Sequence, residues 1–128
     1  MKRDMDLIRV LLLKLENWQM ERGDNVHIRP NDPRLPQGHS VDQMDYHLDL
    51  LMEAGFISGP DGQPMDGIMF RRLSWQGHDF LDSVRDQEIW EKTKKGVEGA
   101  GGFTVDLMKE LARGFVKKQI EEYTGVKL

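Results

Sequence analysis

The sequence predicts an α+β fold, and three consecutive stretches carry this prediction. Apolar residues at helical spacing over 47–54 precede a glycine, which is typical of a helix that ends at residue 55. The segment 58–67 is rich in glycine and proline, as turns are. The run 68–73 then alternates as a strand does. A helix followed by a hairpin forms the second half of a winged helix, so we predict a winged-helix-like domain with additional C-terminal helices.

Composition and charge bound the class of protein. The chain has 128 residues, of which 31% are charged and 38% apolar, and it contains no cysteine, which excludes disulfides and thiolate metal sites. No apolar run approaches the roughly 20 residues that span a bilayer, and the first residues show no apolar signal-peptide core. We therefore expect a cytoplasmic protein that does not enter a membrane. The net charge of −4 means that any nucleic-acid-binding surface has to be a local basic patch.

The first element expected is a helix that Asp4 caps and that runs to about Met20. Residues 26–29 then alternate as a short strand. Three prolines and a glycine within 30–39 exclude a helix of any length there. The second helix of an ordinary helix-turn-helix unit is therefore missing or reduced to a turn. The apolar residues of the first helix recur at helical spacing, namely Leu7, Ile8, Leu11, Leu12, Leu15 and Trp18.

The next elements form the predicted second half of the winged helix. Ser40 is the expected N-cap of a helix over 41–54, and Gly55 is placed to end that helix in a left-handed conformation. The segment 59–67 is too rich in proline and glycine for a regular strand, so we predict a loose wing tip. The return strand over 68–73 follows it.

The remaining sequence predicts two more helices. Ser74 caps a helix that we expect to continue through Trp90 to about Lys95. The glycine-rich segment 96–102 predicts a flexible joint. Thr104 then caps the last helix.

We expect this last helix to run to about Tyr123 and to carry a broad apolar stripe that is buried on the domain or on a second copy of the chain. The predicted organisation is a winged-helix-like domain over 1–95, a joint over 96–102, and a C-terminal helix over 103–128 that packs or forms a homodimer. The apolar candidates for an interface are Trp90, Leu111 and Phe115.

Two stretches resemble known regulators. The sequence YHLDLLMEAGFI over 46–57 resembles the HLxxLxxAGLI end of the recognition helix in MarR-like and PadR-like winged-helix proteins. The sequence RLSWQGHDFL over 72–81 resembles their RLTxxGxxFL exit from the wing. Over nearly its full length, including MKRDMDLI at 1–8, GHDFLD at 77–82 and IWEKTK at 89–94, the chain is similar to an uncharacterised family of small bacterial and prophage proteins. The resemblance implies a winged-helix fold and no established activity, since winged helices also serve as protein-docking modules.

The outer face of the helix over 41–54 departs from the regulator pattern. Its acidic residues follow the spacing i, i+3, i+7 and i+11, which places them on one face. DNA recognition needs donors at this position, whereas carboxylates are repelled by phosphates over roughly 8–10 Å. This stripe is therefore a candidate protein interface. It consists of Asp42, Asp45, Asp49 and Glu53.

The basic candidates for nucleic-acid contact lie on the wing and on the proline-rich loop. Arg71 and Arg72 alternate along the return strand, so they face opposite sides, and one of them has the alternative of pairing with Asp66 or Asp79. Arginine suits both the minor groove and the phosphate backbone. A second patch consists of Arg29, Arg34 and His39.

Catalytic and metal-binding patterns are weak. The four histidines lack the HxxxH or HExxH spacing of a helical metal site. His47 lies near an apolar helix face, so we expect a hydrogen-bonded packing residue. His78, Asp79 and Asp82 form the only cluster that suggests an enzyme or a Mg²⁺ site, and a solvated face is the alternative. With no nucleophile elbow and no phosphate-binding loop, we predict no catalysis, no metal and no cofactor.

Two functions stay open. In the first, the protein is a DNA-binding regulator that uses Arg71 and Arg72 on the wing and dimerises through its last helix. In the second, it is a protein-interaction adaptor, such as a prophage accessory factor or an antitoxin-like partner, and the acidic stripe engages a basic partner.

Overall fold

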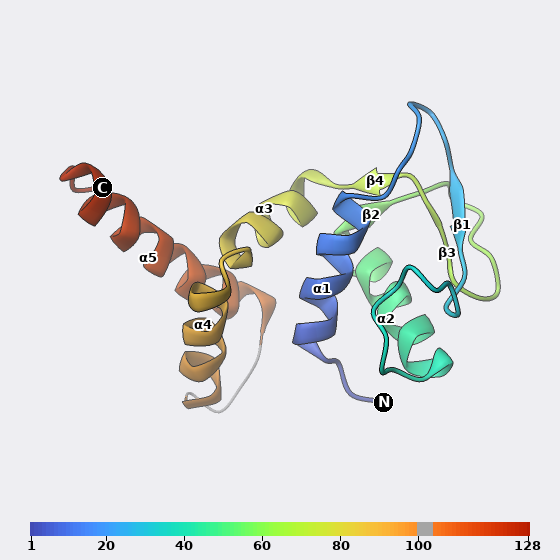
Figure 1. Ribbon diagram of the computed structural model, residues 1–128, viewed down its shortest axis with the longest axis horizontal. Helices are drawn as coiled ribbons and strands as arrows, with labels where there is room; N and C mark the ends of the chain where they lie inside the picture. Colours follow the sequence, from blue (N-terminus) through green and yellow to red (C-terminus); the bar gives the residue numbers. More distant parts are fainter. Residues whose placement is uncertain (100–103) are drawn as a thin grey trace. The chain divides into compact units, whose positions relative to one another are not determined.

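The computed structural model describes residues 1–99 and 104–128 (Figure 1). Over these residues the protein is α+β, with five helices and two small antiparallel sheets of two strands each. The chain divides into two compact units, Met1–Asp79 and Phe80–Leu128. The division falls inside α3 (Trp75–Val84) and not at residue 95, where the sequence-based division ended the first domain.

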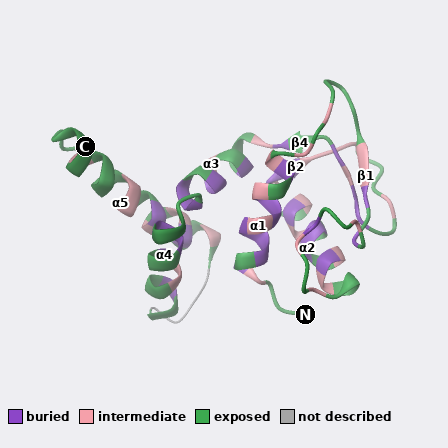
Figure 2. Ribbon diagram, viewed as in Figure 1, coloured by how far each residue is buried: buried purple, intermediate pink, exposed green. Residues whose placement is uncertain are grey.

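Helix α1 (Met5–Glu16) supplies much of the core of the first unit. The Asp4 carboxylate accepts hydrogen bonds from the N–H groups of Asp6 and Leu7, so the predicted cap is confirmed. The helix ends at Glu16 and not at Met20, because the Asn17 N–H bonds to a carbonyl only three residues back and its side-chain amide binds the Leu13 carbonyl. The predicted stripe is buried except for Trp18, which is half-buried (Figure 2).

Strand β1 (Val26–Ile28) follows, and no helix lies between it and α2 (Val41–Glu53). The chain instead makes two short turns, in which the Asp32 N–H bonds to the Arg29 carbonyl and the Leu35 N–H bonds to the Asp32 carbonyl. Leu35 is buried in the core, so this segment packs although it is irregular. The prediction that no helix forms over 30–39 is confirmed.

Ser40 caps α2 by accepting the Gln43 N–H, and Gly55 ends the helix with φ 72°, as predicted. Strand β2 (Ile57–Ser58) pairs with β4 (Arg72–Leu73) in an antiparallel register.

The return strand has a second partner. Its first half, β3 (Ile68–Phe70), pairs antiparallel with β1, and this places Ile28 opposite Ile68. The return strand therefore contributes to both sheets: its partner is β2 in one and β1, from the N-terminal part of the chain, in the other. Ile28 and Ile68, which are paired between β1 and β3, are both buried.

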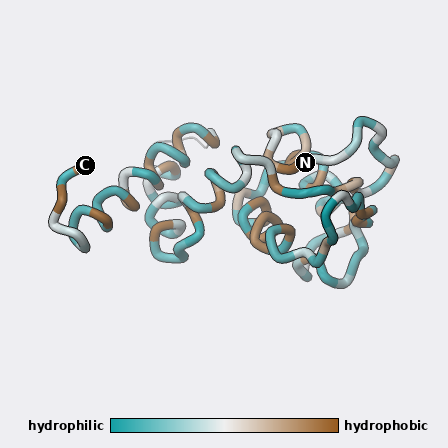
Figure 3. Tube along the Cα trace, turned by 90° about the horizontal axis from the view of Figure 1, so that it is seen from above, coloured by the Kyte–Doolittle hydropathy of each residue, from teal (hydrophilic) through white to brown (hydrophobic). Residues whose placement is uncertain are grey.

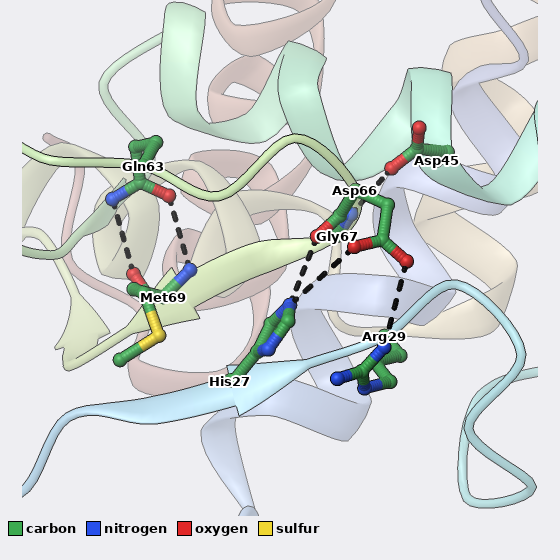
Figure 4. Close-up of polar contacts among 7 residues, drawn as sticks. All are labelled: His27, Arg29, Asp45, Gln63, Asp66, Gly67 and Met69. Atoms are coloured by element: carbon green, nitrogen blue, oxygen red, sulfur yellow. Dashed lines mark hydrogen bonds and ion pairs between the residues drawn. The ribbon is translucent and has the colours of Figure 1, made fainter.

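As predicted, 59–67 contains no regular strand, and the side chain of Gln63 connects the wing tip to β3. The side-chain amide of Gln63 accepts the Met69 N–H at 3.0 Å and donates to the Met69 carbonyl at 3.3 Å, in the manner of a strand neighbour (Figure 4). The same amide nitrogen donates to the Pro60 carbonyl at 2.9 Å. One side chain thus replaces the strand pairing that proline and glycine prevent.

The second unit contains the end of α3, then α4 (Gln87–Gly99) and α5 (Val105–Thr124). The single helix expected from Ser74 to about Lys95 is two helices, because the Asp86 carboxylate accepts the Ile89 N–H and starts α4 afresh. Helix α4 also continues to Gly99, so the first part of the predicted joint is helical, while 100–102 lie outside the described residues.

Helix α5 packs on α4 through its first half. Thr104 caps it as predicted, and Met108 and Ala112 are fully buried. Hydrophobic residues recur to its end (Figure 3), where Ile120 and Tyr123 are exposed. Trp90 is only 1% exposed, so it does not present the exposed ring that its assignment as an interface residue requires. No helix among the described residues is long and apolar enough to cross a membrane.

Candidate functional site

The acidic stripe of α2 is not uniform. The Asp45 carboxylate is half-buried and accepts the backbone N–H of Gly67 at 2.7 Å, which ties α2 to the start of β3 (Figure 4). Asp45 therefore has a structural contact, which sets it apart from the other three carboxylates of the stripe. Sequence spacing could not reveal this, because Gly67 lies 22 residues away along the chain.

The other three carboxylates, those of Asp42, Asp49 and Glu53, face solvent. None of them forms an ion pair with a residue in the described ranges. Partial burial raises the pKa of Asp49, and the neighbouring charges of Asp45 and Glu53 raise it further. Val41 and Tyr46 are also exposed on α2, so the outward face of this helix combines uncompensated negative charge with apolar surface.

We expect Asp49→Asn to stabilise the protein at pH 7 by about 0.5 kcal/mol, because like charges at i, i+4 on a helix each cost about 0.2–0.5 kcal/mol. A raised pKa means that the folded state holds the proton of Asp49 more tightly than the unfolded chain does. Ionised Asp49 thus lowers stability above this pKa, and the difference between variant and parent should vanish below about pH 4. Urea unfolding of the variant and the parent at pH 7 and below about pH 4 measures this difference in the free energy of unfolding.

The matched control for this prediction is Asp42→Asn, which should change stability in the opposite direction. Asp42 lies in the first turn of α2, where the positive end of the helix dipole favours a carboxylate by about 0.3–1 kcal/mol. Equal effects of the two variants would show that Asp49 is not repelled by its neighbours.

The basic candidates of the proline-rich loop are each held by a neighbour. The Arg34 guanidinium forms a bidentate pair with Asp32, at 3.0 and 2.8 Å, and lies 4.1 Å from the ring centroid of Trp18. The hydrogen bonds from Arg34 lower the pKa of Asp32. Arg29 lies 3.9 Å from the Asp66 carboxylate (Figure 4). Each of these two arginines therefore has a carboxylate within ion-pair distance.

His39, the third candidate of this patch, lies 3.3 Å from the side-chain oxygen of Gln43. The wing tip has a further contact, since the ring of His27 donates to the Asp66 carbonyl at 2.9 Å. The predicted second patch therefore consists of side chains with separate local partners.

The two arginines of the return strand have no carboxylate partner among the described residues. Arg71 donates to the side-chain oxygen of Asn25 at 3.1 Å, which leaves its charge uncompensated. The Arg72 side chain is exposed and has no hydrogen bond or ion pair within the described part of the chain. Neither arginine pairs with Asp66, whose carboxylate lies near His27 and Arg29.

The comparisons with known proteins place the chain in a family. Residues 2–103 match the family described as "Hypothetical protein (DUF2513)". The chain belongs to the DUF2513 family. A protein of Haemophilus influenzae described as "Uncharacterized protein" is 31% identical over 123 residues, which cover 94% of this chain and 99% of that protein. No solved structure matches. The family match ends before α5, whereas the Haemophilus protein aligns over most of the chain.

The histidines of this DUF2513 protein have structural contacts. His47 is fully buried, and its Nδ1 donates to the Gln43 carbonyl while its Nε2 accepts the Asp4 N–H, both at 2.8 Å. It is thus a hydrogen-bonded packing residue, as expected. His78 lies 3.9 Å from the Glu16 carboxylate.

The carboxylates of the predicted His78 cluster also have other contacts. The Asp82 carboxylate accepts from Arg85 at 2.8 Å, and Asp86 caps α4. Within residues 1–99 and 104–128 no three His, Asp or Glu side chains come together as a metal-binding group.

Proposed function

We propose that this DUF2513 protein is a non-enzymatic, winged-helix-like adaptor that captures a basic protein partner on the outward face of α2. The winged-helix assignment is supported by the order helix, strand, helix, hairpin in the first unit, and by the pairing of β1 with the return strand. In this assignment the turns between β1 and α2 replace the second helix of a helix-turn-helix unit.

The observation that carries the proposal is the chemistry of α2. In a DNA-binding winged helix this element enters the major groove and needs Arg, Lys, Asn or Gln on its outer face. Here Asp42, Asp49 and Glu53 face solvent and pair with no cationic side chain of residues 1–99 or 104–128, and Val41 and Tyr46 are exposed on the same helix. Such a face repels phosphates and complements a partner that presents lysine or arginine around an apolar contact.

DNA binding through the wing is the second candidate, and Arg72 favours it. This exposed arginine has no partner among the described residues, and its neighbour Arg71 contacts only a neutral amide. A regulator of this kind would use the wing without α2, and the exposed Ile120 and Tyr123 on α5 would supply its dimer contact.

One titration tests both candidates, with fluorescence anisotropy of two labelled probes. The first probe is an amphipathic helical peptide with lysines on one face and leucines on the other, and the second is random-sequence duplex DNA. We expect the peptide to bind and the DNA not to bind at low salt. Combined reversal of Asp42, Asp49 and Glu53 to lysine should weaken peptide binding at least tenfold, because three charge contacts become repulsive.

The matched control carries the same change in net charge elsewhere. It reverses Asp61, Glu98 and Glu110, which are exposed and form no ion pair with described residues. Equal losses in both triple variants would mean that net charge, not α2, attracts the peptide. DNA binding that falls steeply with salt and disappears in Arg71→Ala/Arg72→Ala would replace the adaptor with the regulator.

A further inference from the structure

A small cleft in the first unit lies between the end of α1, the return strand and the start of α3. It encloses about 190 Å³. The buried side chains of Leu15, Phe70 and Leu73 line its interior. No residue of α2 takes part in it, so it is separate from the acidic face. The more exposed lining residues are Glu16, Trp18, Met20, Arg71, Arg72 and His78.

The cleft has a positive rim. The charge of Arg72 has no partner in the described residues, and that of Arg71 is met only by the neutral Asn25 amide. The carboxylate of Glu16, which also belongs to the lining, lies 3.9 Å from the His78 ring. Arginine guanidiniums bind carboxylates bidentately, so two unpaired arginines beside an apolar hollow fit a ligand that is both acidic and apolar.

The size of the cleft narrows the class of ligand. Pockets for small molecules and cofactors usually enclose roughly 300–1,000 Å³, and about 190 Å³ is closer to the volume of one large side chain. A nucleic-acid backbone would contact the arginines but leave the apolar hollow formed by Leu15, Phe70 and Leu73 unfilled. A protein segment with one apolar side chain between carboxylates matches the hollow and the rim together.

We propose that this cleft docks an acidic protein segment, which inserts one apolar or aromatic side chain against Leu15, Phe70 and Leu73 and places carboxylates on Arg71 and Arg72. The proposal does not depend on the adaptor function of α2. Together, the two sites would give one domain an acidic and a basic docking surface.

The test uses the full chain and a fluorescein-labelled peptide with one leucine flanked on each side by three glutamates. A second peptide replaces the leucine with serine. We expect the leucine peptide to bind roughly tenfold or more tightly than the serine peptide, because burying a leucine side chain contributes about 1.5–3 kcal/mol. Arg72→Glu should weaken the leucine peptide at least tenfold. Arg22→Glu, the same charge change at an exposed residue outside the cleft, should leave it nearly unchanged.

Four outcomes would overturn the proposal. Equal binding of the leucine and serine peptides would mean that no apolar anchor enters the cleft. Equal binding by the Arg72→Glu and Arg22→Glu variants would mean that Arg72 does not hold the carboxylates of the peptide. Competition by random-sequence DNA that exceeds competition by the unlabelled leucine peptide would assign the arginines to nucleic acid. Concentration-dependent dimerisation that Arg72→Glu abolishes would make a second copy the occupant. The triple reversal on α2 separates the two proposals. If it leaves binding of the lysine-rich peptide unchanged, the adaptor proposal is wrong and the cleft proposal is unaffected.

Discussion

Gly67→Ala is expected to destabilise the first unit by about 3 kcal/mol or more. Gly67 has φ 67°, a conformation that costs an L-residue about 1–2 kcal/mol. A Cβ added there would also overlap the carbonyl oxygen of Ile28 and approach the backbone of Arg29, and neither can move without opening the pairing of β1 with β3. The Gly67 N–H in addition holds Asp45, so displacement of this residue detaches the wing from α2.

Alanine substitutions at three other glycines separate the cost of the positive φ from the cost of the steric overlap. Gly62→Ala in the same wing should be nearly neutral, because its φ is not positive and nothing lies near an added Cβ. Gly23→Ala should show only the conformational cost, since φ is 86° and the space is open. Gly77→Ala should show only the steric cost, because its Cβ would overlap the carbonyl oxygen of Phe56.

Urea unfolding followed by circular dichroism measures the series, and hydrogen exchange of the β1 and β3 amides locates the change. If Gly67→Ala matched Gly62→Ala, the close approach of the wing to β1 would be wrong. If it matched Gly23→Ala, the overlap with Ile28 would be relieved without cost, and only the backbone conformation would matter.

The predictable parts of the fold are those that local chemistry decides. Asp4, Ser40 and Thr104 cap helices because each hydroxyl or carboxylate reaches an N–H two or three residues later. Gly55 ends α2 for an equally local reason. The start of α4 also has a local cause, because the Asp86 carboxylate accepts the Ile89 N–H. The apolar spacing through Trp90 suggested one continuous helix instead.

The candidate site was less predictable because its residues are paired across long stretches of chain. Alternation predicted opposite faces for Arg71 and Arg72, yet both line the same cleft. The contact of Arg71 with Asn25 spans 46 residues and has no local pattern. The spacing of the acidic residues placed them along one side of α2. It could not distinguish Asp45, which binds the Gly67 N–H, from Asp49, which faces solvent. The cleft joins residues of α1 to the return strand, so its existence depends on tertiary packing alone.

His47→Ala is expected to destabilise the first unit by about 2–4 kcal/mol, since it removes a fully buried ring and its hydrogen bond to the N-cap residue of α1. The Asp4 N–H then loses its acceptor, and α1 loses its side-chain link to α2 at this end. Urea unfolding measures the loss. His39→Ala is the matched control, because its ring has only one long contact, 3.3 Å to Gln43, and it should cost less than about 1 kcal/mol.

A second measurement on the same residue distinguishes the hydrogen bonds from simple packing. A carbonyl only accepts, so Nδ1 must carry the proton that goes to Gln43, and Nε2 must be the acceptor for the Asp4 N–H. Nitrogen NMR of the ring should therefore show a neutral imidazole protonated at Nδ1, and the Asp4 amide should exchange slowly in the parent and rapidly in His47→Ala. A ring protonated at Nε2 would be incompatible with the link to α1, and His47 would then stabilise the protein by its volume alone.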